Sequence, residues 1–272
     1  MREDPPKPQA QPADPVANPA ADPVALARRE QQKPLPRRFY QDARAQPAGD
    51  GFGLVLDGRL AKTPAKHDLI VPTQALADAI AGEWQAQQES IDFAAMPLTR
   101  LAFTAVDGVA GQIPAVIDDI AKYAETDLVC YRAEAPASLV EAQAAAWDPV
   151  LDFAATQLGA RFFCVEGVSF VAQPAAARAA VRDHIVEIGD SRVAPFALAS
   201  LATMTALTGS VLIALALTQG QLSLDAAWGA AHVDEDHQIR QWGEDREAMV
   251  RRDRRFADMA AAVEFWRLIN AA

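Results

Sequence analysis

The chain has 272 residues, 51% of them hydrophobic, which is enough for one large or two ordinary domains with a sizeable core. A formal net charge of −11 argues against nucleic acid or an anionic membrane as the main partner, because both attract clustered Lys and Arg side chains. Two cysteines cannot supply a disulfide framework or a metal site, and their apolar neighbours predict that Cys130 and Cys164 are both buried thiols.

Residues 1–35 are rich in Pro and Ala and contain almost no large apolar side chain. A segment of this composition cannot bury enough surface to order itself, so we predict a disordered tail over 1–35. It has neither the basic start and apolar core of a secretory signal nor the Ser- and Arg-rich character of a mitochondrial transit peptide. These features predict a cytoplasmic protein of a bacterium.

Residues 36–126 have the pattern of a small α+β domain. Asp57-Gly58, between two short apolar runs, is the favoured signal for a two-residue hairpin, because both turn positions need positive φ. Thr73 is a plausible N-cap for the helix that follows it. We expect strands over 38–43, 52–56, 59–62 and 69–71, and further helices over 97–106 and 114–125.

Residues 127–272 have a mainly helical pattern. The predicted fold class is therefore α+β: a small N-terminal α/β layer with a β-hairpin sheet, followed by a mainly α-helical C-terminal domain. Ser138 and Glu141 form a capping-box pattern, which predicts a helix start at Ser138. The other expected features are a bend or restart at Pro149, a short strand pair over 161–171 around Gly167, and a helix from Pro174.

Residues 193–224 carry no charged side chain, and this length raises the question of a membrane span. Pro195 and the Gly209-Ser210 pair divide the segment, and no Lys/Arg cluster marks a cytoplasmic flank. Two buried helices joined near Gly209 therefore fit better than stable insertion into a membrane.

Helical spacing after residue 224 places one acid on an otherwise apolar face. An unpaired carboxylate is costly to bury, so this acid, Glu235, is paired inside the fold, neutralised, or held at a surface that another protein covers. The stripe consists of Leu224, Trp228, Ala231, Glu235, Ile239 and Trp242.

The same region offers little for catalysis. His232 and Asp236 are one helical turn apart, but His237 points roughly 140° away from His232, so the two imidazoles cannot converge on one ion. No nucleophile–base motif or phosphate-binding glycine loop accompanies them. We predict no catalytic, metal or cofactor site. The enzyme alternative is a metal-dependent hydrolase that uses His232 and Asp236.

Tryptophan and arginine, which anchor many protein interfaces, are frequent near the C-terminus, where Trp228, Trp242 and Trp266 lie among charged residues. The alternative is a set of core tryptophans beside a solvated helix. That helix would be held by i,i+4 pairs such as Asp236 with Arg240 and Glu247 with Arg251.

Several short blocks, in this order and spacing, resemble the Atp12 family of assembly chaperones for the F1 sector of ATP synthase. The resemblance extends from about residue 38 to 252, and the tail beyond it matches no pattern of the family. The blocks are Arg38-Phe39-Tyr40, Leu56-Asp57-Gly58-Arg59, Lys62-Thr63-Pro64, Glu83-Trp84 with Gln87-Gln88 and Ile91, Met96-Pro97-Leu98-Thr99, Thr126-Asp127, Cys130-Tyr131-Arg132, Gln143 with Trp147-Asp148-Pro149, Glu235-Asp236-His237-Gln238, and Trp242-Gly243.

The resemblance implies a protein that is not an enzyme and uses no cofactor. Family members, whose eukaryotic relatives act in the mitochondrial matrix, bind the free F1 α subunit and prevent its self-association until the β subunit replaces the chaperone. It also implies an essential acid in the block of Glu235 and Gln238. We expect a monomer, and the expected client-binding residues are Asp234, Glu235, Gln238, Trp242, Glu244 and Asp245. A membrane-attached assembly factor is a third possibility.

Overall fold

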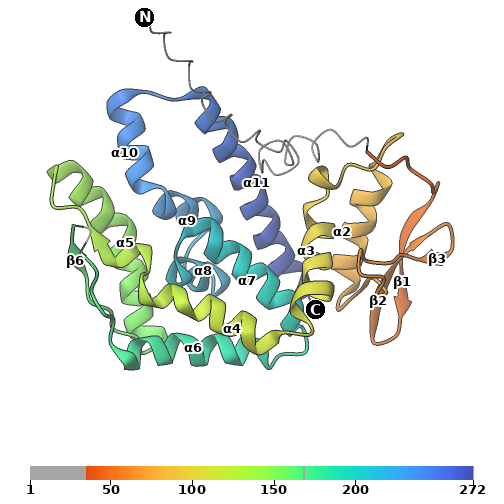
Figure 1. Cartoon of the computed structure of the whole chain (residues 1–272), viewed down its shortest axis with the longest axis horizontal. Coiled ribbons are helices and arrows are strands. Elements are labelled where there is room, and N and C mark those ends of the chain that lie inside the picture. The colour runs from red at the N-terminus through yellow and green to blue at the C-terminus, as the bar shows by residue number, and fades with distance from the viewer. Residues whose placement is uncertain (1–34, 168, 272) are drawn as a thin grey trace, which may run out of the picture.

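The computed structural model describes residues 35–167 and 169–271, so the predicted tail over 1–34 lies outside the described residues. The first part of the described chain forms an antiparallel sheet that ends the molecule on one side (Figure 1). β2 lies at its centre and pairs with the other three strands. The strands are β1 (Ala43–Ala48), β2 (Gly51–Leu56), β3 (Arg59–Leu60) and β4 (Ile70–Val71).

The predicted Asp57-Gly58 hairpin is confirmed. Leu56 pairs with Arg59 across the turn, and φ is 47° at Asp57 and 81° at Gly58, the combination that a two-residue hairpin needs. The predicted β-hairpin layer is thus present, and it precedes a mainly helical remainder as the sequence indicates.

The expected strand over 38–43 is wrong, because the first strand begins only at Ala43. The Arg38 guanidinium donates to the carbonyls of Tyr40 (3.0 Å) and Gln41 (2.8 Å), which holds the preceding segment in an irregular path. The carboxylate of Asp57 accepts hydrogen bonds from the backbone amides that follow Tyr40. These side chains take the backbone groups that a strand would use for its ladder.

α2 (Gln74–Gln85) covers the sheet and begins as predicted. The Thr73 hydroxyl accepts from the backbone N–H of Leu76 (3.2 Å) and donates to the carbonyl of Leu268 (2.8 Å). Thr73 therefore caps α2 and also ties it to the last helix of the chain. The inner face of α2 buries Leu76, Ile80 and Trp84.

The remaining helices pack around α7 and α8 at the centre, with α4 and α6 along one edge, α5 at the end far from the sheet, and α11 running back toward α2 (Figure 1). The expected helices over 97–106 and 114–125 correspond to α3 with a π-helical extension (Thr104–Val109) and to α4 with a short turn (Lys122–Glu125). The bounds are α3 (Pro97–Phe103), α4 (Ile113–Ala121), α5 (Ala137–Gln157), α6 (Ala175–Gly189), α7 (Ala194–Thr208), α8 (Val211–Thr218), α9 (Leu224–Ala231), α10 (Val233–Trp242) and α11 (Arg246–Ile269), with short turns at Phe93–Ala95 and Leu128–Cys130.

The uncharged segment forms two buried helices that meet at Gly209, as predicted. Gly209 ends α7 with a φ of 69°, a left-handed conformation that favours glycine. α8 then starts at a fully buried carboxylate, because Asp127 accepts from the backbone N–H of Leu212 (3.2 Å). The Asp127 carboxylate from outside the segment and the Ser210 hydroxyl within it thus both accept from backbone N–H groups at the start of α8.

The expected strand pair around Gly167 is wrong. β6 (Val165–Glu166) pairs in parallel with β5 (Tyr131–Arg132), a partner more than 30 positions earlier in the chain. The expectation of two buried thiols is also only half right. Cys130 is fully buried, whereas Cys164 is exposed on the irregular segment that leads into β6.

The predicted helix start at Ser138 is also wrong, the expected restart at Pro149 does not occur, and the expected bend at Pro149 stays a prediction. Pro136 rather than Ser138 occupies the N-cap position, and the Ser138 hydroxyl lies 3.0 Å from Nε2 of His237 on α10 instead of capping its own helix. Pro149 lies inside α5 without ending it. The hydroxyl therefore forms a long-range contact that competes with the local capping pattern.

The C-terminal tail, which matches no family pattern, is part of the core. Phe265 of α11 is fully buried and stacks near Phe196 of α7, with ring centroids 6.3 Å apart. The Ser200 hydroxyl of α7 donates to the carbonyl of Ala262 (2.7 Å). Because α11 contacts α2, α3, α7 and α9, it joins the sheet end to the helical end.

Within residues 35–167 and 169–271, no single helix is long and apolar enough to cross a membrane. One pair, Pro97–Val109 with Ile113–Cys130, passes on length and composition only when taken together, and the pair is bent by 110°. The predicted domain boundary between 36–126 and 127–272 stays a prediction.

Candidate functional site

The predicted apolar stripe does not exist as one face, because the helix breaks at His232. The backbone N–H of His232 bonds to the carbonyl of Gly229 (3.2 Å), while its Nδ1 lies 2.9 Å from the carbonyl of Trp228. The imidazole thus takes the carbonyl that would continue the helix, and the chain turns into α10. As a result Trp228 is buried in the core, whereas Trp242 is 77% exposed.

α10 rests on the rest of the molecule through one side. Val233 and His237, one helical turn apart, are both buried. Glu235 projects from the opposite side, and Gln238, Ile239 and Trp242 follow it at i+3, i+4 and i+7. We call these four residues the α10 face.

Asp234 is committed to the fold rather than to this face. Its carboxylate accepts a 2.6 Å hydrogen bond from the side-chain amide of Gln143, which is 2% exposed. The Gln143 carbonyl oxygen in turn accepts from the backbone N–H of Ala133 (2.7 Å). Asp234 therefore completes a network between α5 and α10, and its expected client contact stays a prediction.

Asp236 is also committed, though not to the expected partner. It pairs with Arg252 of α11, whose side chain is 13% exposed, instead of with Arg240 one turn ahead. This hydrogen bond to the carboxylate raises the pKa of Arg252. The expected pair of Glu247 with Arg251 is present at 3.8 Å on the exposed side of α11. The region thus contains a core tryptophan, Trp228, and ion pairs on its helices, as one alternative predicts, beside the exposed α10 face.

Glu235 keeps its carboxylate at the surface, where its side chain is 43% exposed. The nearest side-chain partner among the described residues is Nε2 of His232, at 4.0 Å. Burial lowers the pKa of His232, so the imidazole is neutral near pH 7 and this contact is no ion pair. The acid does lie in the first turn of α10, where the helix dipole favours a negative charge by about 0.3–1 kcal/mol.

The remaining predicted residues lie on or near the α10 face. Gln238 is exposed, and Trp242 ends the helix. Glu244 is exposed in the loop that follows. Asp245 is exposed too, but its carboxylate caps α11 by accepting from the backbone N–H of Ala248 (2.7 Å). The structure thus brings the six residues to one end of the molecule and assigns two of them a structural contact.

The geometry gives the hydrolase alternative no support. Asp236 is paired with Arg252, and one nitrogen of His232 is engaged by the Trp228 carbonyl. Over the described part of the chain, no three His, Cys, Asp or Glu side chains are grouped as a metal site would require.

Comparison with known proteins identifies the family. Residues 37–155 match the model of the ATP12 chaperone protein family. Atp12 from Paracoccus denitrificans is 40% identical, with a TM-score of 0.81, and the match covers 86% of this chain and 99% of that one. The chain belongs to the ATP12 chaperone family.

Two further solved structures agree with this assignment. A candidate chaperone from Agrobacterium tumefaciens is 46% identical, with a TM-score of 0.83 and 92% of each chain covered. A point mutant of the Paracoccus Atp12p is 39% identical over 86% of this chain and 98% of that chain, with a TM-score of 0.81. As an ATP12 family member, the chain has a chaperone role.

Sequence reasoning missed one feature of this ATP12 protein. A pocket of about 590 Å³ lies beside the sheet, and four of the blocks that carry the family resemblance contribute residues to its lining. The signal was available in principle, because Phe39 is a large apolar residue placed between charged and polar neighbours.

Proposed function

We propose that this ATP12 protein binds the free F1 α subunit through the α10 face and prevents the subunit from associating with itself until the β subunit takes its place. Family membership supports a chaperone of ATP synthase assembly with a protein client. The choice of the α subunit follows from the family resemblance. The protein acts without a cofactor or a catalytic step, as a monomer in the bacterial cytoplasm.

We assign the site to the α10 face because Glu235 and Trp242 have no evident structural role in the described part of the chain. Trp242 is 77% exposed at the end of α10, where a large apolar ring gains nothing from the fold. The Glu235 side chain is 43% exposed, and its nearest side-chain partner in the described structure is His232, at 4.0 Å. Tryptophan is among the residues that contribute most to protein interfaces. We therefore assign Trp242 the apolar contact, with Gln238 beside it.

Glu235 supplies the polar contact by accepting hydrogen bonds from an arginine or backbone donor of the client. Glu244 and Asp245 add negative charge at the same end, which favours a cationic patch and speeds its approach. Such a contact allows the β subunit to replace the chaperone on the α subunit. A carboxylate that returns to water when the client leaves avoids the penalty of an unpaired buried charge.

Co-expression with the cognate F1 subunits tests this function. Tagged chaperone should co-purify with the α subunit when β is absent, and addition of β should release the chaperone as α and β assemble. Failure to capture α, or a complex of all three that persists after β is added, would contradict the proposal.

A further inference from the structure

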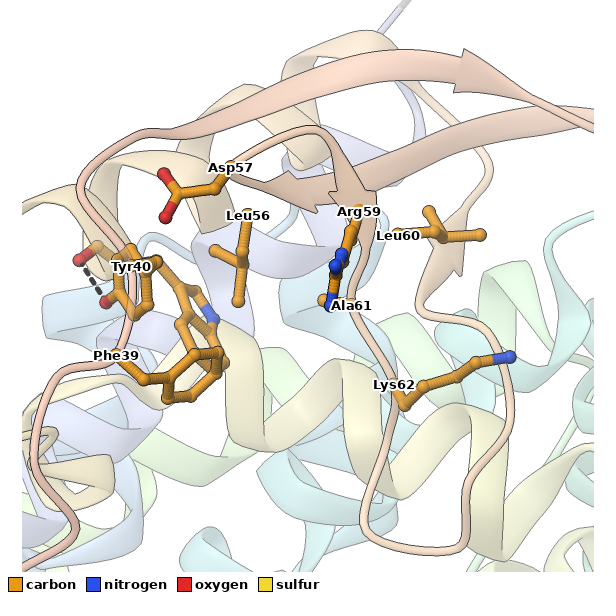
Figure 2. Close-up of a pocket in the computed structure, with 9 residues that line it drawn as sticks. Phe39, Tyr40, Leu56, Asp57, Arg59, Leu60, Ala61 and Lys62 are labelled. Atoms are coloured by element: carbon orange, nitrogen blue, oxygen red, sulfur yellow. Dashed lines mark hydrogen bonds between the residues drawn. The ribbon is translucent and has the colours of Figure 1, made fainter.

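The pocket at the sheet end is a second surface without a partner in the fold. Figure 2 shows Phe39 and Tyr40 on one side, Arg59 and Lys62 on the other, and Leu56 between them. Its volume is about 590 Å³, which accommodates one large side chain with its flanking backbone. All of its lining residues fall within residues 37–155, the segment that matches the family.

The walls of this pocket are apolar and partly open to water. Phe39 is 72% exposed and contacts only the edge of Tyr40 among aromatic rings, at a centroid distance of 5.3 Å. Trp84, which also lines the pocket, is 5% exposed, and its indole N–H has no acceptor within the described chain. Phe39 therefore gives the pocket an apolar wall that is open to water.

The rim of the pocket carries a free positive charge. Asp57 is engaged by the backbone amides of Gln41 and Asp42, and these hydrogen bonds lower its pKa. Lys62 is paired with Asp68 at 2.5 Å. Arg59 is exposed and has no ion-pair partner in the part of the chain that the structure describes. Residues 35–66 contain six Lys or Arg and three Asp, although the whole chain has a net charge of −11.

We propose that this pocket binds a client segment in which a large apolar side chain stands next to a carboxylate. The apolar side chain packs between Phe39 and Leu56, and the carboxylate pairs with Arg59. That the client is the F1 α subunit rests on the function proposed above.

The opposite charges of the two proposed docking surfaces fix the orientation of the client on the chaperone. The sheet and α10 lie at opposite ends of the long axis of the molecule (Figure 1). An acidic segment of the client fits the sheet end, and a cationic patch fits the α10 face. Since reversal of the client would bring like charges together at both ends, the pair of surfaces fixes one orientation.

Site-specific photocrosslinking in the full chain tests this proposal. A benzophenone amino acid replaces Phe39 in one variant and Trp242 in a second, each co-expressed with the α subunit, and mass spectrometry maps the crosslinked peptides. We expect the reagent at position 39 to mark an α-subunit peptide with an acid beside a large apolar residue. A crosslink from position 39 confined to residues 1–34 of the same chain would overturn the pocket proposal.

The companion variant separates the two proposals. Crosslinking to α from position 242 but not from position 39 would overturn the pocket and leave the proposed function intact. Crosslinking to α from neither position, together with no co-purification of α, would defeat the proposed function and the pocket with it.

A charge reversal gives an independent measure. Arg59→Glu should weaken binding of the purified α subunit by about tenfold, the scale for loss of one well-placed charge pair, and leave the melting temperature unchanged. Arg161→Glu, an exposed arginine with no ion pair among the described residues, is the matched control and should bind as the parent does. Equal affinity of both variants would overturn the role of Arg59.

Discussion

The helices α7 and α8 use their polar side chains differently from the α10 face. In the uncharged centre, two hydroxyls bond nearby backbone groups: Ser210 accepts from the N–H of Ile213 at 3.0 Å and caps α8, and Thr208 donates to the carbonyl of Met204 at 2.8 Å. On the α10 face, the Glu235 carboxylate accepts no hydrogen bond among the described residues, and the Trp242 ring is 77% exposed. Stability therefore resides in the centre, and we propose that the α10 face is kept free for a partner. Each variant below tests this separation, in order of its expected effect on folding.

Phe265→Ala should have the largest effect. This ring is fully buried where α11 packs on α7, and removal of a buried phenylalanine typically costs about 3–5 kcal/mol. Urea unfolding followed by circular dichroism measures the loss. The control Val250→Ala, at a position 44% exposed on the same helix, should change the unfolding free energy by less than about 0.5 kcal/mol. Similar costs for both would mean that the C-terminal helix is not part of the core.

Asp127 makes the free energy of unfolding depend on pH. Burial raises its pKa from 3.8 to about 6, against the opposing effect of the hydrogen bonds from Ser210 and the start of α8. The folded state thus binds the proton of Asp127 more tightly than the unfolded state does. The contribution of Asp127 to the free energy of unfolding therefore rises as the pH falls from 6 to 4. Its size is on the order of 3 kcal/mol at most.

Urea unfolding between pH 4 and pH 7 tests that contribution. The difference in unfolding free energy between the parent and Asp127→Asn should move in favour of the parent as the pH falls through 6. A difference that stays constant over this range would show that the carboxylate is ionised throughout, held by its donors.

Asp234→Ala should have an intermediate effect, because it strands the buried amide of Gln143. Loss of a hydrogen bond to a charged group costs about 1.5–3 kcal/mol. Asp234→Asn keeps one acceptor and should recover part of the loss. If the alanine variant melts like the parent yet loses the α subunit, Asp234 belongs to the docking surface after all, and the boundary between the two regions must move.

Trp242→Ala should leave folding within about 0.5 kcal/mol of the parent, because the ring is 77% exposed. Affinity for the α subunit should fall roughly 30-fold, which corresponds to an interface residue worth about 2 kcal/mol. Fluorescence anisotropy with labelled chaperone measures this loss. Unchanged affinity would remove Trp242 from the interface.

The sequence predicts those features that depend on neighbouring residues. The Asp57-Gly58 hairpin, the Thr73 cap and the two helices that meet at Gly209 are all confirmed, because positive φ, a hydroxyl near a helix start and an absence of charge act locally. The α+β class follows from their order along the chain.

Features that depend on distant contacts are not predicted. The break at His232, whose ring packs on Trp228, lies between the buried Trp228 and the exposed Trp242. The Ser138 hydroxyl contacts His237, 99 positions later in the chain, instead of capping its own helix. The predicted site residues do reach one end of the molecule, but their division into structural and free carboxylates required the partners Gln143 and Arg252.

The most direct test of the central claim is charge reversal at Glu235. Glu235→Lys should lose capture of the F1 α subunit in co-purification while the unfolding free energy falls by no more than about 1 kcal/mol, the cost of opposing the helix dipole. Asp225→Lys is the matched control, since Asp225 is an exposed acid in the first turn of α9, and it should carry the same small cost and retain capture. A Glu235→Lys protein that unfolds, or one that remains folded and still holds the α subunit, would contradict the assignment of the α10 face to the client.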